Sequence, residues 1–286
     1  MTEPGHDQPD PPSPPPSGAV GLANAWSAVV TLGLVACGLV WMVDRWAPPQ
    51  DLPWKPLDLR HPPGLATGAK IARLDLDDHA SPQRVEAATD ACLELLHQAG
   101  VEARRAEDRD DGGFCIVRGA VRLTGGEMTP IRPAGLTLRC PVAVRHILWD
   151  RHVLQPGARQ IMGSEVVRID SLGTYACRRI YGSAAATARP SQHARANAID
   201  ISAIRLADGR QVSVLDDWGG QGPAGAAGAS LLRRLRDGAC GLFTNVLTPD
   251  YNVAHRDHFH VDAAARGICS GPRSDQNSVR PEAVYS

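Results

Sequence analysis

The hydrophobic pattern is most distinct near the start of the chain, where 25 consecutive residues, 19–43, carry no charge. An apolar helix of about 20 residues crosses the hydrocarbon core of a bilayer, so this stretch predicts a transmembrane helix. Asp44 and Arg45 follow it directly, and Trp41 and Trp46 suit the interface between membrane and water.

Two other targeting signals compete for the same stretch. A cleaved signal peptide has a basic segment before a short apolar run, whereas this run is long and no Lys or Arg precedes it. A lipoprotein needs a lipobox, and residues 34–38 resemble one that would make Cys37 the lipidated residue. A single membrane anchor agrees best with the length of the run.

Composition divides the rest of the chain. Residues 1–18 are rich in proline and have no apolar surface to bury, which predicts a disordered or polyproline tether. Residues 44–66 are also proline-rich and predict either an extended linker or a lead-in that lies on the folded domain. One mixed domain is expected over 67–270, followed by a loose tail, 271–286.

Three segments of this domain predict helices, at 81–99, 141–155 and 229–237. In the first, apolar residues recur at steps of three and four, which gives one apolar face. Ser81 can cap this helix, Pro82 suits its first turn and Gly100 ends it. The second is expected to end before Pro156, because proline interrupts a helix.

Short apolar runs predict strands, which lie at 114–123, 135–139, 166–169 and 212–215. Residues 219–228 are rich in Gly and Ala and are expected to form a loop. Strands and helices in this mixture predict an α+β domain. The formal net charge is −1 and the isoelectric point is about 6.8, which argues against a nucleic-acid-binding protein, because such a protein needs a concentrated positive field.

The candidate chemistry lies in two histidine-containing stretches, 191–201 and 255–262. A catalytic zinc ion needs three protein ligands and one open position for water. Asp200 lies where an apolar strand begins, and an ionised carboxylate there must be paired or bound to metal to offset its desolvation. In the second stretch, strand alternation places His258, His260 and Asp262 on one face. Asp262 is expected either to orient a histidine or to lie at the surface, and not to be a ligand.

These residues resemble a known superfamily of peptidases. Four positions match the signature S-x-H-x-x-G-x-A-x-D of the zinc D-Ala-D-Ala carboxypeptidases and related peptidoglycan peptidases: Ser191, His193, Ala198 and Asp200. The signature's glycine falls on Ala196. The fold of these enzymes is shared with the hedgehog signalling domain. Three histidines resemble the H-x-x-H-x-H arrangement of the penicillin-insensitive murein endopeptidases: His255, His258 and His260.

A closer resemblance covers residues 50–270, which are similar to the bacterial extensin-like C-terminal domain family. The segments that carry it are 173–182, 191–201, 206–210, 236–240 and 249–262. Together the two resemblances imply a small antiparallel sheet with flanking helices, in a hedgehog/D-Ala-D-Ala-peptidase-like zinc fold that follows one transmembrane helix.

Carried over by position, the resemblance implies the zinc ligands His193, Asp200 and His260. Three side chains are candidates for the base that takes the proton of zinc-bound water: His258, which strand geometry favours, then Asp257 and His255. Arg178 follows a pattern similar to the superfamily's S-G-Y-R. It is expected to stabilise an oxyanion, to bind a substrate carboxylate or to form a structural ion pair.

The implied function is a membrane-anchored periplasmic zinc metallopeptidase that hydrolyses peptide or amide bonds of peptidoglycan stem peptides. One alternative is a non-catalytic, zinc-containing module of the same fold that binds cell wall or protein. Another is a zinc hydrolase of a different bond, because metal ligands do not encode the bond that is cleaved.

Six of the seven cysteines lie in the domain and none lies in the proposed zinc motifs. Proximity along the chain suggests three pairs: Cys92–Cys115, Cys140–Cys177 and Cys240–Cys269. An even set of six suits an oxidising periplasm, whereas the basic residues that follow the apolar stretch favour a cytosolic domain. We give the cysteines more weight and predict a single-pass protein of the inner membrane, held through residues 19–43, with its C-terminal domain in the periplasm.

Overall fold

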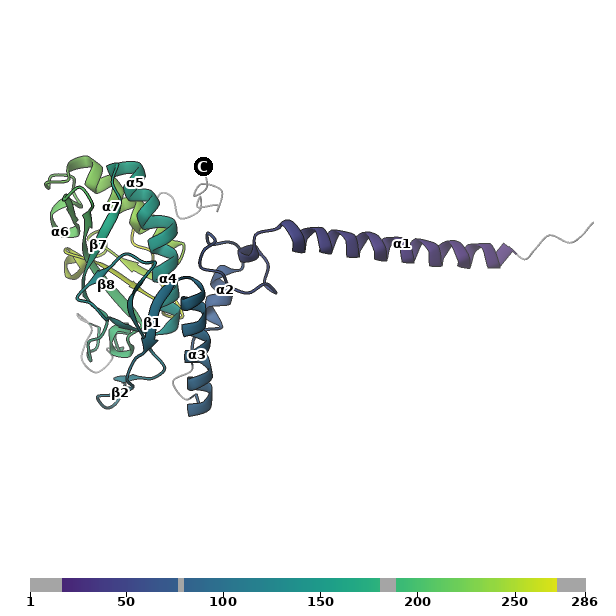
Figure 1. The fold of residues 1–286 in the computed structure, drawn as a ribbon, viewed down its shortest axis with the longest axis horizontal. Helices are drawn as coiled ribbons and strands as arrows, with labels where there is room; N and C mark the ends of the chain where they lie inside the picture. Colours follow the sequence, from purple (N-terminus) through teal and green to yellow (C-terminus); the bar gives the residue numbers. More distant parts are fainter. Residues whose placement is uncertain (1–16, 77–79, 181–188, 272–286) are drawn as a thin grey trace, which may run out of the picture. The chain divides into compact units, whose positions relative to one another are not determined.

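The computed structural model describes residues 17–76, 80–180 and 189–271 (Figure 1). The chain divides into two units, Met1–Ala47 and Pro48–Ser286. The expected tether 1–18 and tail 271–286 lie outside the described residues, apart from Ser17, Gly18 and Gly271.

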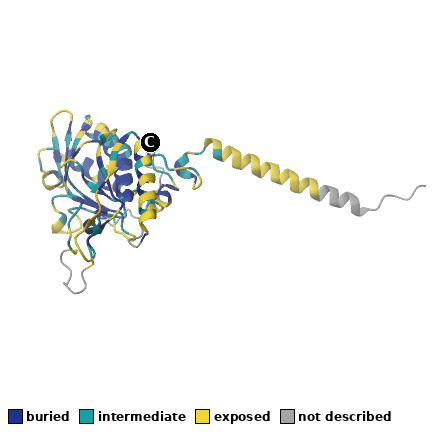
Figure 2. Ribbon diagram, turned by 60° about the horizontal axis from the view of Figure 1, so that its bottom comes forward, coloured by how far each residue is buried: buried dark blue, intermediate teal, exposed yellow. Residues whose placement is uncertain are grey.

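The first unit contains one long helix, α1 (Ser17–Trp46). Its segment Trp26–Trp46 has a mean hydropathy of 2.0 and none of it is buried, as the exposed colouring in Figure 2 shows. This helix is long and apolar enough to cross a membrane, which agrees with a membrane anchor and also with a signal sequence.

The second unit begins with a lead-in segment, residues 48–66, that packs onto the rest of the unit. It contains the 3-10 helix η1 (Pro49–Asp51) and is followed by α2 (Thr67–Ala72). Four of its side chains are buried: Gln50, Leu52, Leu59 and Ala66. Lys70 of α2 donates a hydrogen bond of 2.6 Å to the carbonyl oxygen of Pro49, so the lead-in is attached by both apolar and polar contacts.

Helix α3 (Pro82–Gln98) has the predicted position, and the side chain of Ser81 caps it by accepting a hydrogen bond from the backbone of Arg84. A three-stranded antiparallel sheet follows, in the order β1-β4-β6. Its strands are β1 (Val101–Arg105), β4 (Val121–Gly126) and β6 (Thr137–Leu138). Between β1 and β4 the chain forms a small hairpin of β2 (Arg109–Asp110) and β3 (Ile116–Val117).

Helix α4 (Cys140–Trp149) is buried along its whole length. A π-helical segment (Asp150–Leu154) and α5 (Gln155–Met162) continue it, so the predicted end at residue 155 is wrong. The π segment starts a new helical register in which Pro156 lies in the first turn of α5. The missing backbone N–H of proline has no cost there.

The main sheet has the strand order β10-β11-β8-β7-β5, and β9 pairs with the second half of β8. Its strands are β5 (Ile131–Arg132), β7 (Val166–Gly173), β8 (Ala198–Leu206), β9 (Gln211–Ser213), β10 (Asn245–Leu247) and β11 (Phe259–Asp262). All pairs are antiparallel except β5 with β7. The α+β class and the small antiparallel sheets are therefore confirmed.

Two predictions after β8 need correction. The strand expected over 212–215 ends at Ser213, whose side chain caps a short helix, α6 (Val214–Asp217). The third helix, α7, runs over Gly225–Cys240, so the end of the expected loop 219–228 is helical. Packing explains the extension, because buried Gly228 and Ala229 face the unit's interior. Trp149 of α4 donates to a carbonyl of α7, which joins the two helices in the core.

The disulfides are Cys92–Cys140, Cys115–Cys177 and Cys240–Cys269. Only the third was predicted correctly. The other two pairings were wrong because proximity along the chain does not report how helices pack: α3 lies against the start of α4, and this brings Cys92 to Cys140. Cys37 on α1 is a free thiol.

Candidate metal centre

Two neighbouring strands place the first two residues of the centre. Strands β8 and β11 are antiparallel, and in their register His260 lies directly opposite Asp200. Residues opposite each other in such a pair have side chains on the same face, about 4.5–5.5 Å apart at Cβ. The flanking apolar pair Phe259 and Ile201 is buried and holds the two strands in this register.

A tight turn places the third residue. His193 lies in the 3-10 helix η3 (Gln192–Arg195), where the side chain of Ser191 caps the turn by accepting from the backbone N–H of His193. Ala196 then turns the chain toward β8 with a positive φ of 52°. Glycine adopts this conformation without strain, so the backbone explains why the resembling signature has glycine at this position.

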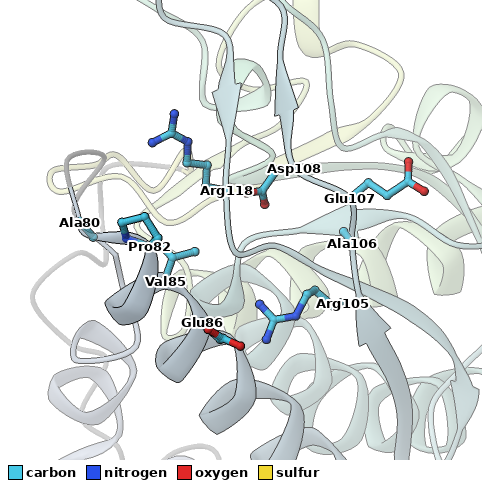
Figure 3. A pocket seen from close by; sticks show the side chains of 9 residues that line it. All are labelled: Ala80, Pro82, Val85, Glu86, Arg105, Ala106, Glu107, Asp108 and Arg118. Carbon is cyan, nitrogen blue, oxygen red and sulfur yellow. The ribbon is translucent and has the colours of Figure 1, made fainter.

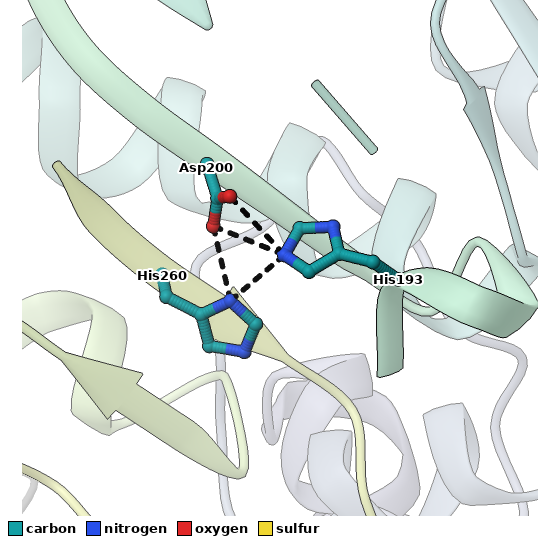
Figure 4. A group of neighbouring side chains, drawn as sticks. All are labelled: His193, Asp200 and His260. Carbon is teal, nitrogen blue, oxygen red and sulfur yellow. Dashed lines mark hydrogen bonds and ion pairs between the residues drawn. The ribbon is translucent and has the colours of Figure 1, made fainter. Parts of the chain in front are cut away.

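The side chains of these three residues meet (Figure 4). His193 Nε2 lies 3.0 Å from His260 Nδ1 and 3.2 Å from Asp200 Oδ1, and His260 Nδ1 lies 3.0 Å from the same oxygen. The three candidate ligand atoms all lie within 4.8 Å of one another. Two imidazole nitrogens and one carboxylate oxygen can therefore hold a metal ion, and this donor set and number are typical of catalytic zinc sites.

Electrostatics also favour a cation at this point. Burial raises the pKa of Asp200, but the hydrogen bonds and charges of His193 and His260 outweigh it and hold that pKa well below its usual range. Burial lowers the pKa of His260, whereas Asp200 and Asp262 raise it, and the result is a pKa of about 9. In the metal-free protein an imidazolium therefore supplies the positive charge that these carboxylates require.

Asp262 contacts the far side of the ring of His260, as expected for an orienting residue. Its Oδ2 lies 3.1 Å from His260 Nε2. Asn245 donates to both of its oxygens, at 2.9 and 3.0 Å, and the backbone of Ala264 donates to Oδ1. Sequence reasoning missed Asn245, because it belongs to no histidine motif and only the pairing of β10 with β11 places it there.

The other two histidines of the second stretch lie beside the metal-binding group. His258 Nδ1 is 2.9 Å from Asp257 Oδ1, and His258 Nε2 is 3.7 Å from Asp200 Oδ1. The ring of His255 lies 5.2 Å from that of His258 and 5.9 Å from that of His260, measured between centroids. The structure thus places His255 and His258 next to the metal-binding group, and Asp257 next to His258.

The environment of these groups shifts two of their pKa values. Burial lowers the pKa of His255 to about 4, with further contributions from the positive charges of His258, His260 and Arg178. The hydrogen bond with His258 lowers the pKa of Asp257. His255 is therefore a neutral imidazole at pH 7, and Asp257 is an ionised partner of His258.

Arg178 reaches this region from a different segment. Its charge acts on His255, and its carbonyl oxygen accepts a hydrogen bond from the backbone N–H of Ser191, which precedes the metal-binding turn. The predicted site residues therefore come from three loop or turn segments and two strands, and the structure places them in one neighbourhood.

A separate hollow of about 770 Å³ lies between the start of α3, the end of β1 and the loop that precedes β2 (Figure 3). Its lining carries charges of both signs, including Glu86, Arg105, Asp108 and Arg118. None of its lining residues belongs to the metal-binding group.

Comparison with known proteins identifies one family. A family model described as extensin-like protein C-terminus matches residues 90–271, which is more than half of the chain. No curated protein and no solved structure gives a significant match.

Proposed function

Because the chain belongs to the extensin-like protein C-terminus family, and because it gathers two histidines and a carboxylate around one point, we propose that it is a zinc-dependent hydrolase. Its proposed substrates are the peptide or amide bonds of peptidoglycan stem peptides. The observation that carries the proposal is the group His193, Asp200 and His260, with a histidine–carboxylate pair beside it.

The donor set is compatible with zinc, and the choice of zinc rests on the motif resemblance. Imidazole nitrogen suits zinc, and a single carboxylate completes three protein ligands, which leaves a fourth position for water or substrate. His193, Asp200 and His260 would hold the ion, which would supply a water ligand with its pKa lowered toward about 7 and a Lewis acid for a substrate carbonyl.

His258 is the proposed general base. Asp257 Oδ1 lies 2.9 Å from Nδ1 of its ring, and in the neutral ring this contact favours the tautomer with the proton on Nδ1 and the free lone pair on Nε2. Nε2 is also the atom that faces Asp200, at 3.7 Å. A base must lie within hydrogen-bond reach of the proton that it takes, and the position of His258 Nε2 beside a proposed metal ligand supports this role.

The remaining candidates receive other roles. Asp257 orients His258 and stabilises the imidazolium that forms when His258 accepts a proton. His255 has a pKa of about 4, which makes it a weak base at neutral pH, and we assign it to substrate positioning. Arg178 supplies a fixed positive charge near His255 for a developing oxyanion or a substrate carboxylate.

The peptidoglycan substrate and the zinc-peptidase fold rest on the motif resemblance. His193 and Asp200 have the spacing of the carboxypeptidase signature, and the three histidines of residues 255–260 have the spacing of the endopeptidase pattern. We extend the proposal to the fold, which we assign to the hedgehog/D-Ala-D-Ala-peptidase-like superfamily.

The proposed location is the inner membrane, with α1 as a single-pass anchor and the second unit in the periplasm. Three disulfides within the second unit support this orientation, because disulfides persist in oxidising compartments. A C-terminal reporter of the kind that is active only after export should be active in this fusion. If a C-terminal reporter is instead active only in the cytosol, the second unit faces the cytosol and the proposed topology is wrong.

The activity is tested with the full chain, purified in detergent, loaded with equimolar zinc and incubated with muropeptides. Mass spectrometry should detect cleavage products that disappear in His193→Ala. His97→Ala is the matched control, because His97 is an exposed histidine on α3 outside the site, and it should retain activity. Tight zinc binding without cleavage of any muropeptide would reject the hydrolase and favour a non-catalytic binding module.

A further inference from the structure

The turn that carries His193 belongs to a pair of antiparallel backbone segments, which we call the ribbon and whose two segments we call its arms. Residues 176–180 form the first arm and residues 189–193 form the second. The arms are antiparallel: Ala176 N–H donates to the carbonyl oxygen of His193 at 3.2 Å, and Ser191 N–H donates to that of Arg178 at 3.1 Å. The first arm therefore holds the backbone of a metal ligand directly.

The β2–β3 hairpin lies behind the first arm. Tyr175, just before that arm, donates its hydroxyl to Asp111 at 2.5 Å, and the guanidinium of Arg109 lies 4.5 Å from the Tyr175 ring centre. Arg179 of the arm lies over the ring of Phe114, at 4.8 Å. Every one of these contacts joins the hairpin to the ribbon.

One covalent bond fixes this contact, the disulfide Cys115–Cys177. Cys115 is fully buried, at 1% exposure, and Cys177 immediately precedes Arg178 in the chain. The hairpin strands have two residues each, and isolated two-stranded hairpins are marginally stable at best in water. Apart from this bond, the contacts between hairpin and ribbon given above are all made by side chains.

We propose that Cys115–Cys177 is a positioning element of the metal centre: through the ribbon it holds His193 and Arg178 where the site needs them. The inference rests on the proposed metal site and deepens it. The positioning acts through backbone hydrogen bonds, so its loss should weaken metal binding even while the rest of the domain stays folded.

The positioning role also implies a sequence of events, in which the disulfide forms before the site binds metal tightly. Two thiols form the disulfide by exchange with an oxidised dithiol–disulfide oxidoreductase, which takes up the two electrons and two protons and becomes a dithiol. High metal affinity then follows oxidation of the chain, and a reduced chain in the cytosol would hold the metal weakly.

The test compares two double variants of the full chain in detergent. Cys115→Ser/Cys177→Ser removes the positioning bond. Cys240→Ser/Cys269→Ser is the matched control, because it removes a disulfide that joins α7 to the segment beside β10 and includes no residue of either arm. The two bonds close loops of 62 and 29 residues, so by chain entropy their removal has costs of similar size.

Two readouts report on the metal centre itself. Zinc affinity is measured by competition with a chromophoric chelator, and cobalt substitution reports ligand geometry through its visible absorption spectrum. We expect Kd to rise at least tenfold, with an altered cobalt spectrum, in Cys115→Ser/Cys177→Ser, and less than threefold in the control. Equal effects in both variants, or an unchanged Kd in the first, would overturn the proposal.

A milder variant keeps the test valid if the first fails to fold. Tyr175→Ala removes the hydroxyl and ring contacts between hairpin and ribbon but leaves the disulfide in place. Its Kd for zinc should rise about threefold, and an unchanged value would contradict the positioning role. Because affinity is measured without peptide substrate, a protein that binds zinc but cleaves nothing would reject the hydrolase and leave this inference standing.

Discussion

Replacing Asp262 by Asn removes one negative charge beside a metal ligand and keeps the size of the side chain. Asp262 accepts hydrogen bonds from Asn245, from the backbone of Ala264 and, through Oδ2, from the ring of His260. When Nδ1 of His260 binds a cation, Nε2 carries the proton and needs this acceptor. Asn has a single carbonyl oxygen, so it cannot serve both the ring and the backbone donor.

The expected cost follows from this lost partner. Mutation of a residue that hydrogen-bonds a metal-bound histidine typically weakens metal affinity 10- to 100-fold, which corresponds to about 1.4–2.7 kcal/mol. The loss of one hydrogen bond to a charged group, about 1.5–3 kcal/mol, has the same size. The two estimates agree, and we expect the zinc Kd of Asp262→Asn to rise 10- to 100-fold at pH 9.

At lower pH, competition between protons and zinc for His260 reduces this loss of zinc affinity. Asp262 is one of two carboxylates that raise the pKa of His260 to about 9 in the metal-free protein. Below that pH a proton must leave His260 before the metal binds, and the variant, with a lower pKa, releases that proton more easily. The loss of affinity should therefore be smaller at pH 6.5 than at pH 9.

The measurement is zinc affinity at both pH values, by chelator competition on the full chain in detergent. Asp208→Asn is the control, because it removes the same charge from an exposed ion pair with Arg210 and should leave Kd unchanged. If Asp262→Asn binds zinc as tightly as the wild type at both pH values, Asp262 does not orient His260 and the reasoning is refuted.

Three further predictions concern stability. Ala196→Gly should change the free energy of unfolding by no more than about 1 kcal/mol, because relief of the left-handed strain, about 1–2 kcal/mol, is offset by the lost buried methyl group and the freer unfolded chain. Ala196→Val should lower the free energy of unfolding, measured in urea, by more than about 2 kcal/mol. Equal changes in the two variants would contradict this prediction. With a chelator present to remove metal, the stability contributed by His260 should be fully present below about pH 6.5 and lost as the pH rises through about 9, because the pKa of His260 is raised in the folded protein. A midpoint of urea unfolding that increases over this pH interval would contradict the prediction. Zinc at 100 times its Kd should stabilise the protein by about 2.7 kcal/mol, seen as a higher melting temperature, and His193→Ala should abolish the increase; a similar increase in that variant would place the metal elsewhere.

Local patterns in the sequence predicted well the features that local physics determines. The apolar spacing of α3 and its Ser81 cap placed that helix to within one residue at each end. The motif spacing selected His193, Asp200 and His260, which the structure brings together as a group able to hold a metal. Strand alternation also placed Asp262 on the side of His260.

Features that depend on tertiary packing were not predictable from these patterns. The register that sets His260 opposite Asp200 joins strands 60 residues apart, and no periodicity in either strand specifies it. Pro156 indicated the end of a helix, yet a π-helical turn ends just before it and α5 continues past it. The pairing of Cys92 with Cys140 likewise follows from the packing of α3 on α4.

The lead-in segment determines where the protein can be truncated. The family match begins at residue 90, in the middle of α3, whereas Leu59 and Ile71, upstream of that point, are each only 1% exposed. A fragment cut to the matched region would lose the Ser81 cap and half of α3, and it would expose the apolar surface that these residues cover, which favours aggregation. An expression fragment that retains the complete core therefore starts at residue 48, some 40 residues before the region by which the family is detected.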